Sequence, residues 1–180
     1  IPKTAGISLV NAVYGDVSNE GHRKVEFYKK IFKKNFNNFF LFSFVRNPYE
    51  RLYSAYKFLQ SGGMNTHDQN AFKKYLISYN NFEDFIYNGL SKQMVNEIIH
   101  FKFQSEFICN DEGEIIVDFV GKYETIEKDI SHLSNLIKKD ISLPYLNRGK
   151  AKKSHDKVYT DEMKEIVYRI YRKDFEIFNY

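Results

Sequence analysis

Cysteine is almost absent from this chain of 180 residues, because Cys109 is its only one. A single thiol excludes an internal disulfide and a cysteine-rich metal site. No stretch approaches the run of apolar residues that a membrane span requires, and no signal peptide is visible. The sequence also lacks an Asn-x-Ser/Thr sequon, which argues against a glycosylated protein of a secretory lumen.

Apolar residues are plentiful, at 43% hydrophobic and 17% aromatic, so we expect a packed globular protein. The length is suited to one domain with a sizeable core. A net charge of +4 favours an anionic ligand but is small for a dense nucleic-acid binder. Arginine is scarce beside lysine.

Strand and helix patterns alternate along the chain, which predicts an α/β fold with a parallel sheet. Residues 39–45 are almost wholly apolar, as in a strand covered on both faces, and a second strand is expected over 114–120. Residues 61–70 are a polar, glycine-containing loop, long enough for an active-site lid. The expected helices are 6–14, 25–34, 48–60, 71–79, 82–88, 92–99, 125–139 and a last helix capped by Thr160.

The first eight residues, Ile-Pro-Lys-Thr-Ala-Gly-Ile-Ser, form a turn that leads into a helical pattern. Backbone N–H groups and the dipole at a helix start attract an anion. Lys3 adds a mobile positive charge, Thr4 and Ser8 add hydroxyl donors, and Gly6 lets a ligand approach the backbone. The lysine precedes the turn and there is a single glycine, so this is not a GxxxxGK[ST] loop. An ordinary capped helix with an exposed lysine is the alternative.

The second motif, residues 44–56, runs from an apolar strand through Arg46-Asn47-Pro48 into a helix. Arg46 falls at the carboxyl end of the strand, the usual ligand side of a parallel sheet. Ser54 lies two turns along the helix and could face the same anion, whereas we expect Arg51 to tie the helix down by an ion pair. The sequence therefore predicts two anion sites, as a nucleotide phosphorylated on its 5′ and 3′ sides would need.

These strings resemble motifs of the sulfotransferase superfamily, specifically its carbohydrate branch of Golgi-type and bacterial membrane-associated enzymes. Residues 1–8 resemble the family's 5′-phosphosulfate loop, and residues 46–56 resemble its 3′-phosphate motif, R-[DN]-P-x-x-R-x-x-S-x-Y. Residues 118–125, Asp-Phe-Val-Gly-Lys-Tyr-Glu-Thr, are similar to the strand-to-helix signature of chondroitin-type enzymes. The tail from residue 143 to 175 also fits, so the similarity touches most of the chain.

The resemblance implies a three-layer P-loop-like fold, with a central parallel sheet flanked by helices. Residues 1–180 would form a single domain whose first strand lies upstream of residue 1. The donor would be 3′-phosphoadenosine 5′-phosphosulfate (PAPS), the product 3′-phosphoadenosine 5′-phosphate (PAP), and the acceptor a carbohydrate hydroxyl.

The resemblance also implies roles for the residues at matching positions. The 5′-phosphosulfate would be held by Lys3, Thr4, Ala5, Gly6, Ile7 and Ser8, although Ala5 replaces a commoner glycine. Arg46 and Ser54 would bind the 3′-phosphate. Tyr123 would line the nucleotide pocket, and Lys152 or Lys153 would close over it.

Sulfuryl transfer is an in-line displacement in which positioning and charge stabilisation dominate. We expect Lys3 to stabilise charge on the leaving oxygen and expect no metal to be needed. The acceptor's proton requires a general base. His100 is the first candidate and His67 the second, with a structural hydrogen-bonding role as the alternative. Gln104 and Glu106 are candidate contacts to the acceptor.

Three other functions are consistent with parts of this pattern. A nucleotide-dependent phosphotransferase would use the same loop and sheet, but would need magnesium ligands. A nucleic-acid-binding module would use the basic stretches, although we expect no nucleic acid as partner. A sulfotransferase fold that binds without turnover is the third. We expect a location in a bacterial cytoplasm or on the cytoplasmic membrane face, with any anchor upstream of residue 1; the Golgi lumen is the alternative.

Overall fold

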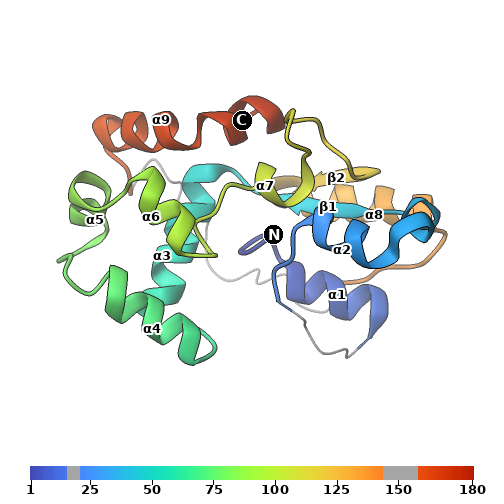
Figure 1. Ribbon diagram of the computed structural model, residues 1–180, viewed down its shortest axis with the longest axis horizontal. Helices are drawn as coiled ribbons and strands as arrows, with labels where there is room; N and C mark the ends of the chain where they lie inside the picture. Colours follow the sequence, from blue (N-terminus) through green and yellow to red (C-terminus); the bar gives the residue numbers. More distant parts are fainter. Residues whose placement is uncertain (16–20, 144–157) are drawn as a thin grey trace. The chain divides into compact units, whose positions relative to one another are not determined.

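The computed structural model describes residues 1–15, 21–143 and 158–180, which are mostly helical (Figure 1). No helix in these ranges is long and apolar enough to cross a membrane. Two strands, β1 (Phe42–Val45) and β2 (Phe119–Lys122), and two short 3₁₀ helices, η1 (Lys33–Asn38) and η2 (Tyr123–Thr125), accompany the α-helices. The α-helices of the described ranges are α1 (Gly6–Tyr14), α2 (Val25–Phe32), α3 (Pro48–Gln60), α4 (Thr66–Tyr75), α5 (Phe82–Asn88), α6 (Lys92–Glu97), α7 (Ser105–Ile108), α8 (Ile126–Ile137) and α9 (Asp161–Phe178).

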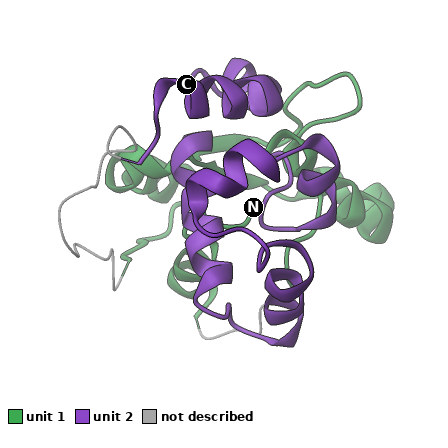
Figure 2. Cartoon of the chain, turned by 90° about the vertical axis from the view of Figure 1, so that its left-hand side faces the viewer, with its two compact units in different colours: residues 1–46, 104–151 green, residues 47–103, 152–180 purple. Residues whose placement is uncertain are grey.

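The chain divides into two compact units, shown in green and purple in Figure 2. The first unit comprises residues 1–46 and 104–151, and the second comprises residues 47–103 and 152–180. The chain passes from the first unit to the second directly after β1, between Arg46 and Asn47. The first unit therefore contains both strands, and the second is helical in its described part.

The sheet of the first unit is a parallel pair in which Phe42 aligns with Phe119 and Val45 with Lys122. These are the only strands among the described residues, so the predicted central sheet is seen only as this pair. Phe44 lies opposite Gly121, where a Cβ would come within 2.4 Å of the Phe44 ring. Apolar residues of α1 and α8 complete this core: Leu9, Val13, Ile126, Ile130 and Leu133.

Both strands are shorter than predicted, and the prediction was wrong at both amino ends and at the carboxyl end of β2, which continues to Lys122. The side chain of Asp118 takes the place of a ladder partner, because its Oδ2 accepts the Leu41 N–H at 2.6 Å. Pairing therefore begins only at Phe42 and Phe119. Phe39 and Phe40, which the apolar pattern placed in a buried strand, are 46% and 43% exposed.

The second unit is built around α3, α5 and α9, whose apolar faces share one core. α3 begins and ends where the sequence predicts: Asn47 Oδ1 accepts the Tyr49 N–H at 3.0 Å, and Pro48 occupies the first helical position. The predicted 61–70 loop is wrong, because α4 already begins at Thr66. Asn65 caps that helix by accepting the Asp68 N–H at 3.0 Å, which leaves only residues 61–65 between α3 and α4.

Arg51 is the largest of the nearly inaccessible side chains, at 1% exposure, and it lies in the core of the second unit. Its guanidinium donates hydrogen bonds to the carbonyls of His100 at 3.1 Å, Phe101 at 3.3 Å and Lys102 at 2.5 Å. Tyr171 of α9 donates to the same Phe101 carbonyl at 2.7 Å. Arg51 thus holds α3 against the segment that follows α6. This structural role agrees with the prediction, but the bonds go to carbonyl oxygens, whereas an ion pair was expected.

Candidate functional site

β1 and β2 end at the same edge of the sheet, and each is followed by one of the predicted site residues. Because Val45 pairs with Lys122, Arg46 and Tyr123 are the next residues along the two parallel strands. The Cζ atom of Arg46 lies 4.3 Å from the centre of the Tyr123 ring. This cation–π contact favours the position of the guanidinium over the ring. Two residues that the sequence predicted separately therefore lie together.

The backbone of Arg46 is held by the side chain of Gln104, which is fully buried. The Arg46 N–H donates to Gln104 Oε1 at 2.9 Å, and Gln104 Nε2 donates to the Arg46 carbonyl at 2.8 Å. One side-chain amide thus satisfies both backbone groups just after the strand. The prediction that Gln104 contacts an acceptor is wrong because of this burial. Its actual role was missed, since an isolated glutamine carries no sequence signal.

The first loop reaches the end of β1 through the backbone of Lys3. Arg46 Nη1 donates to the Lys3 carbonyl at 3.4 Å, near the upper limit for a hydrogen bond. Lys3 and Ala5 both have left-handed backbone conformations, with φ of 68° and 66°, so the loop turns sharply. Thr4 is 2% exposed, and its hydroxyl donates to the Ile1 carbonyl at 3.0 Å. The Thr4 hydroxyl therefore closes the turn, and its contact with the ligand stays a prediction.

The helix that follows this loop presents backbone donors at its amino end. The N–H groups of Gly6, Ile7 and Ser8 lie in the first turn of α1, where a helix has no internal acceptors. No side chain caps this end, because the preceding residue is Ala5. A Cβ at Gly6 would meet nothing closer than the Ile1 carbonyl at 3.8 Å, an ordinary contact. The protein's own packing therefore does not require glycine at this position.

The remaining predicted site residues lie elsewhere in the chain. Ser54 is on α3 in the second unit and is partly exposed, and His67 is exposed in the first turn of α4. His100 follows α6 and is 7% exposed. Lys152 and Lys153 lie outside the described residues.

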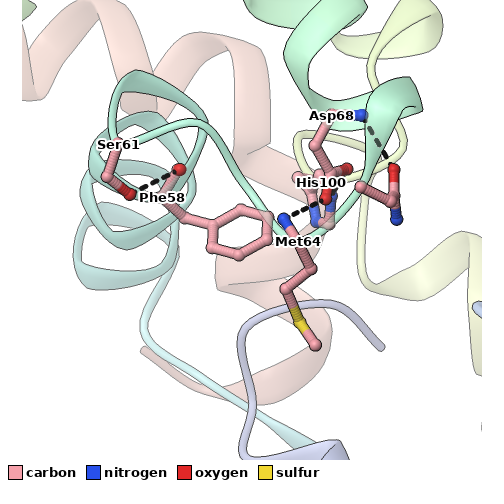
Figure 3. Close-up of polar contacts among 6 residues, drawn as sticks. Phe58, Ser61, Met64, Asp68 and His100 are labelled. Atoms are coloured by element: carbon pink, nitrogen blue, oxygen red, sulfur yellow. Dashed lines mark hydrogen bonds and ion pairs between the residues drawn. The ribbon is translucent and has the colours of Figure 1, made fainter.

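His100 forms a buried pair with Asp68 of α4 (Figure 3). Its Nε2 lies 2.9 Å from Asp68 Oδ1, and the two side chains are 8% and 9% exposed. The second carboxylate oxygen of Asp68 accepts the Met64 N–H at 2.9 Å. The Phe58 ring packs edge-on against the imidazole, with 5.0 Å between ring centres. His100 thus helps to hold the 61–65 turn, an arrangement that the sequence pattern did not predict.

A hollow of about 500 Å³ opens within the first unit beside the first loop. Thr4 and Gly6 line one side of it, whereas Lys3, Arg46 and Tyr123 do not border it. Most of its wall is aromatic or aliphatic, and α1, α2 and the stretch from η1 to β1 supply much of it, including Leu9, Val25, Tyr28, Phe32, Phe39 and Phe44. The hollow is therefore distinct from the cluster of Lys3, Arg46 and Tyr123.

Comparison with known proteins gives a family match that covers most of the chain. Residues 9–180 match the model of the sulfotransferase family. Carbohydrate sulfotransferase 11 of Rattus norvegicus is 28% identical over 162 residues, which cover 77% of this chain and 46% of that protein. The Danio rerio protein of the same name is 25% identical over 170 residues, covering 79% of this chain and 47% of the relative. An uncharacterized protein of Archaeoglobus fulgidus is 26% identical over 116 residues, covering 64% of this chain and 78% of its own length.

The chain spans about half the length of the carbohydrate sulfotransferases that it matches. The family match begins at residue 9, after the first loop, and it includes β1, Arg46 and Tyr123. No solved structure matches the chain significantly.

Proposed function

This chain belongs to the sulfotransferase family, and from that premise we propose that it transfers a sulfuryl group from PAPS to a carbohydrate hydroxyl. The observation that carries the proposal is the meeting of Lys3, Arg46 and Tyr123 at the carboxyl ends of two parallel strands. Ligands of parallel sheets bind at this edge. Two positive side chains and a helix amino end, gathered in one unit, suit a ligand that carries more than one negative group.

The 5′-phosphosulfate is assigned to the first loop. The N–H groups of Gly6, Ile7 and Ser8 would donate to its oxygens, and Gly6 would leave room for them beside the backbone. The Lys3 ammonium would stabilise the charge that develops on the phosphate oxygen as the sulfur–oxygen bond breaks. A new sulfur–oxygen bond forms to the acceptor hydroxyl, and the leaving product is PAP.

The 3′-phosphate is assigned to Arg46. A guanidinium fork matches the geometry of phosphate oxygens, and the Tyr123 ring holds its plane. The 3.4 Å contact to the Lys3 carbonyl is weak enough for a phosphate oxygen to replace it. Ser54 is assigned to the same phosphate from its motif spacing alone, and Lys152 and Lys153 remain proposals from the family resemblance.

The acceptor's proton is assigned to a histidine. His100 is the first candidate, because the Asp68 carboxylate at 2.9 Å fixes the orientation of its imidazole, as in catalytic His–Asp pairs. His67 is the second candidate. Its side chain is exposed, and it precedes Asp68 in the first turn of α4.

A thermal-shift comparison of PAP, AMP, ATP and a short oligonucleotide tests the proposal. We expect PAP to stabilise the protein most, and Arg46→Ala to remove the preference for PAP over AMP. Arg169→Ala, on the exposed face of α9, is the matched control and should leave the preference intact. An equal shift with ATP and PAP would instead favour a phosphotransferase, and stabilisation by the oligonucleotide alone would favour a nucleic-acid-binding module.

A further inference from the structure

The positive charge of this protein is concentrated in residues 23–40, which we call the basic–aromatic segment. It contains six basic residues and one acidic residue, so its net charge is +5, whereas the whole chain carries +4. The rest of the chain is therefore close to neutral. The segment forms α2, η1 and the approach to β1, all within the first unit. Neither the proposed donor site nor the proposed chemistry uses it.

The apolar residues of the segment are largely exposed. α2 carries five of them (Val25, Phe27, Tyr28, Ile31 and Phe32), and at 3.6 residues per turn they fall within an arc of about 160°. Only Val25 is buried. Ile31 is 55% exposed and Phe32 41% exposed, and Phe32 packs on Phe39 with 4.6 Å between ring centres. Phe39 and Phe40 extend the apolar surface beyond the helix, and with Phe32 they also line the hollow of the first unit, whereas Ile31 does not border it.

The lysines of the segment are largely without carboxylate partners. Lys24 pairs with Glu106 at 2.5 Å, and Lys29 lies 3.6 Å from Glu26. No carboxylate in the described part of the chain lies within ion-pair distance of the other three segment lysines, which are Lys30, Lys33 and Lys34. Exposed lysines therefore flank exposed apolar side chains on one continuous stretch.

We propose that the basic–aromatic segment docks this protein on the surface of an anionic lipid bilayer. An amphipathic helix with a lysine-rich polar face and large apolar side chains is suited to lie in the plane of a membrane interface. Its lysines would contact acidic headgroups, and its exposed apolar residues would enter the headgroup–acyl boundary. The inserted side chains would be Ile31, Phe32, Phe39 and Phe40. This inference does not depend on the proposed sulfuryl transfer.

Charge complementarity alone would also suit an acidic polysaccharide or a nucleic acid. Both of those ligands are hydrated polyanions that bind mainly through their charges. Neither offers an apolar phase that would bury an aliphatic side chain such as Ile31. Nucleic-acid sites favour arginine, whose planar fork matches phosphates, whereas the segment has five lysines and one arginine. The combination of diffuse lysine charge with exposed aliphatic and aromatic area favours the bilayer.

Vesicle flotation tests the proposal directly. We expect the protein to float with vesicles of phosphatidylcholine mixed with phosphatidylglycerol, but not with phosphatidylcholine alone, and to be released by high salt. Neutralising Lys29, Lys30, Lys33 and Lys34 to Gln should lower the partition coefficient about fivefold per lysine. Lys73→Gln with Lys74→Gln, two exposed lysines of α4, is the matched control and should change it little.

A fluorescent reporter tests insertion as distinct from charge attraction. The chain contains no tryptophan, so Ile31→Trp introduces a single tryptophan into the segment, which can be excited selectively at the red edge of tyrosine absorption. Its emission should shift to the blue with the anionic vesicles, whereas Ile77→Trp, at a position 63% exposed in the second unit, should not shift. The variants alter exposed side chains, and circular dichroism melting checks that they fold.

Equal binding to neutral vesicles, or full binding by the lysine variant, would overturn the proposal. A blue shift of the same size with a DNA oligonucleotide or dextran sulfate would show a polyanion site and overturn it as well.

Discussion

The guanidinium of Arg46 lies over the ring of Tyr123, with 4.3 Å from Cζ to the ring centre. The contact follows from the register of the two strands, because Arg46 and Tyr123 occupy equivalent positions just after a parallel pair. It connects two motifs that are far apart in the sequence. In the proposed function, Tyr123 acts through Arg46 by holding the guanidinium in one plane.

Tyr123 substitutions test that positioning role. Tyr123→Phe keeps an aromatic face and should leave PAP binding nearly unchanged, whereas Tyr123→Leu removes it and should weaken PAP binding about 3- to 30-fold. AMP binding, measured by calorimetry on the same variants, should change much less. A similar loss for PAP and AMP would show that Tyr123 acts on the nucleoside and not through Arg46.

Lys3→Ala tests the assignment of transition-state charge to the first loop. An interaction made mainly in the transition state should lower kcat about 10²- to 10³-fold while PAP affinity falls only a few-fold. Steady-state kinetics with labelled donor and calorimetry with PAP provide the two numbers. Lys102→Ala, at a partly exposed lysine outside the proposed site, is the control. Parallel losses in kcat and affinity would mean that Lys3 only binds.

Much of this arrangement could be predicted from local patterns. Asn47 and Pro48 mark the start of α3 by cap chemistry, and Thr160 marks the start of α9 in the same way. Such signals are contained within one turn of helix, so they do not depend on tertiary contacts. The family resemblance is confirmed by the match over residues 9–180.

The errors have tertiary causes. An apolar run predicted a strand from Phe39, but the Asp118 carboxylate takes the Leu41 N–H and pairing starts later. The polar 61–70 stretch looked like a loop, although Asn65 starts a helix within it. Nothing in the sequence indicated that Gln104 holds the backbone of Arg46, because that role depends on groups 58 residues away.

Arg51 should be essential for stability. Replacing it by Leu would leave the carbonyls of His100, Phe101 and Lys102 buried without this donor. We expect the free energy of unfolding to fall by about 3–5 kcal/mol. Urea denaturation measures the loss, and Arg172→Leu on the exposed face of α9 should change it by less than about 0.5 kcal/mol. An equally small effect at Arg51 would contradict this role.

Tyr171 should make the protein sensitive to alkali. Burial raises the pKa of Tyr171, with Asp174 adding to the rise and Arg51 opposing it. The Tyr171 hydroxyl ionises near pH 10 in the unfolded protein and only at higher pH in the folded protein. The contribution of the neutral hydroxyl to the free energy of unfolding is therefore complete below about pH 10 and declines above it. In urea titrations, Tyr171→Phe should therefore lose stability less steeply above that pH than the parent protein. Tyr168→Phe, at a position 38% exposed on the same helix, should follow the parent, and identical slopes for all three would refute the argument.

Substitutions of His100 and Asp68 test whether His100 is a general base or has only a structural role. If His100 is the base, His100→Asn should lower kcat about 10²- to 10⁴-fold and remove the decline of kcat/KM that follows imidazole protonation at low pH. Asp68→Asn keeps an oxygen for the Met64 N–H, so the 61–65 turn should survive while the imidazole loses its carboxylate. That variant should fold, with kcat reduced and KM little changed.

His67→Asn alters an exposed side chain and should retain both activity and the low-pH limb. If His100→Asn lowers the melting temperature but keeps the pH profile, the buried pair has only a structural role. If His67→Asn abolishes the low-pH limb, His67 is the base.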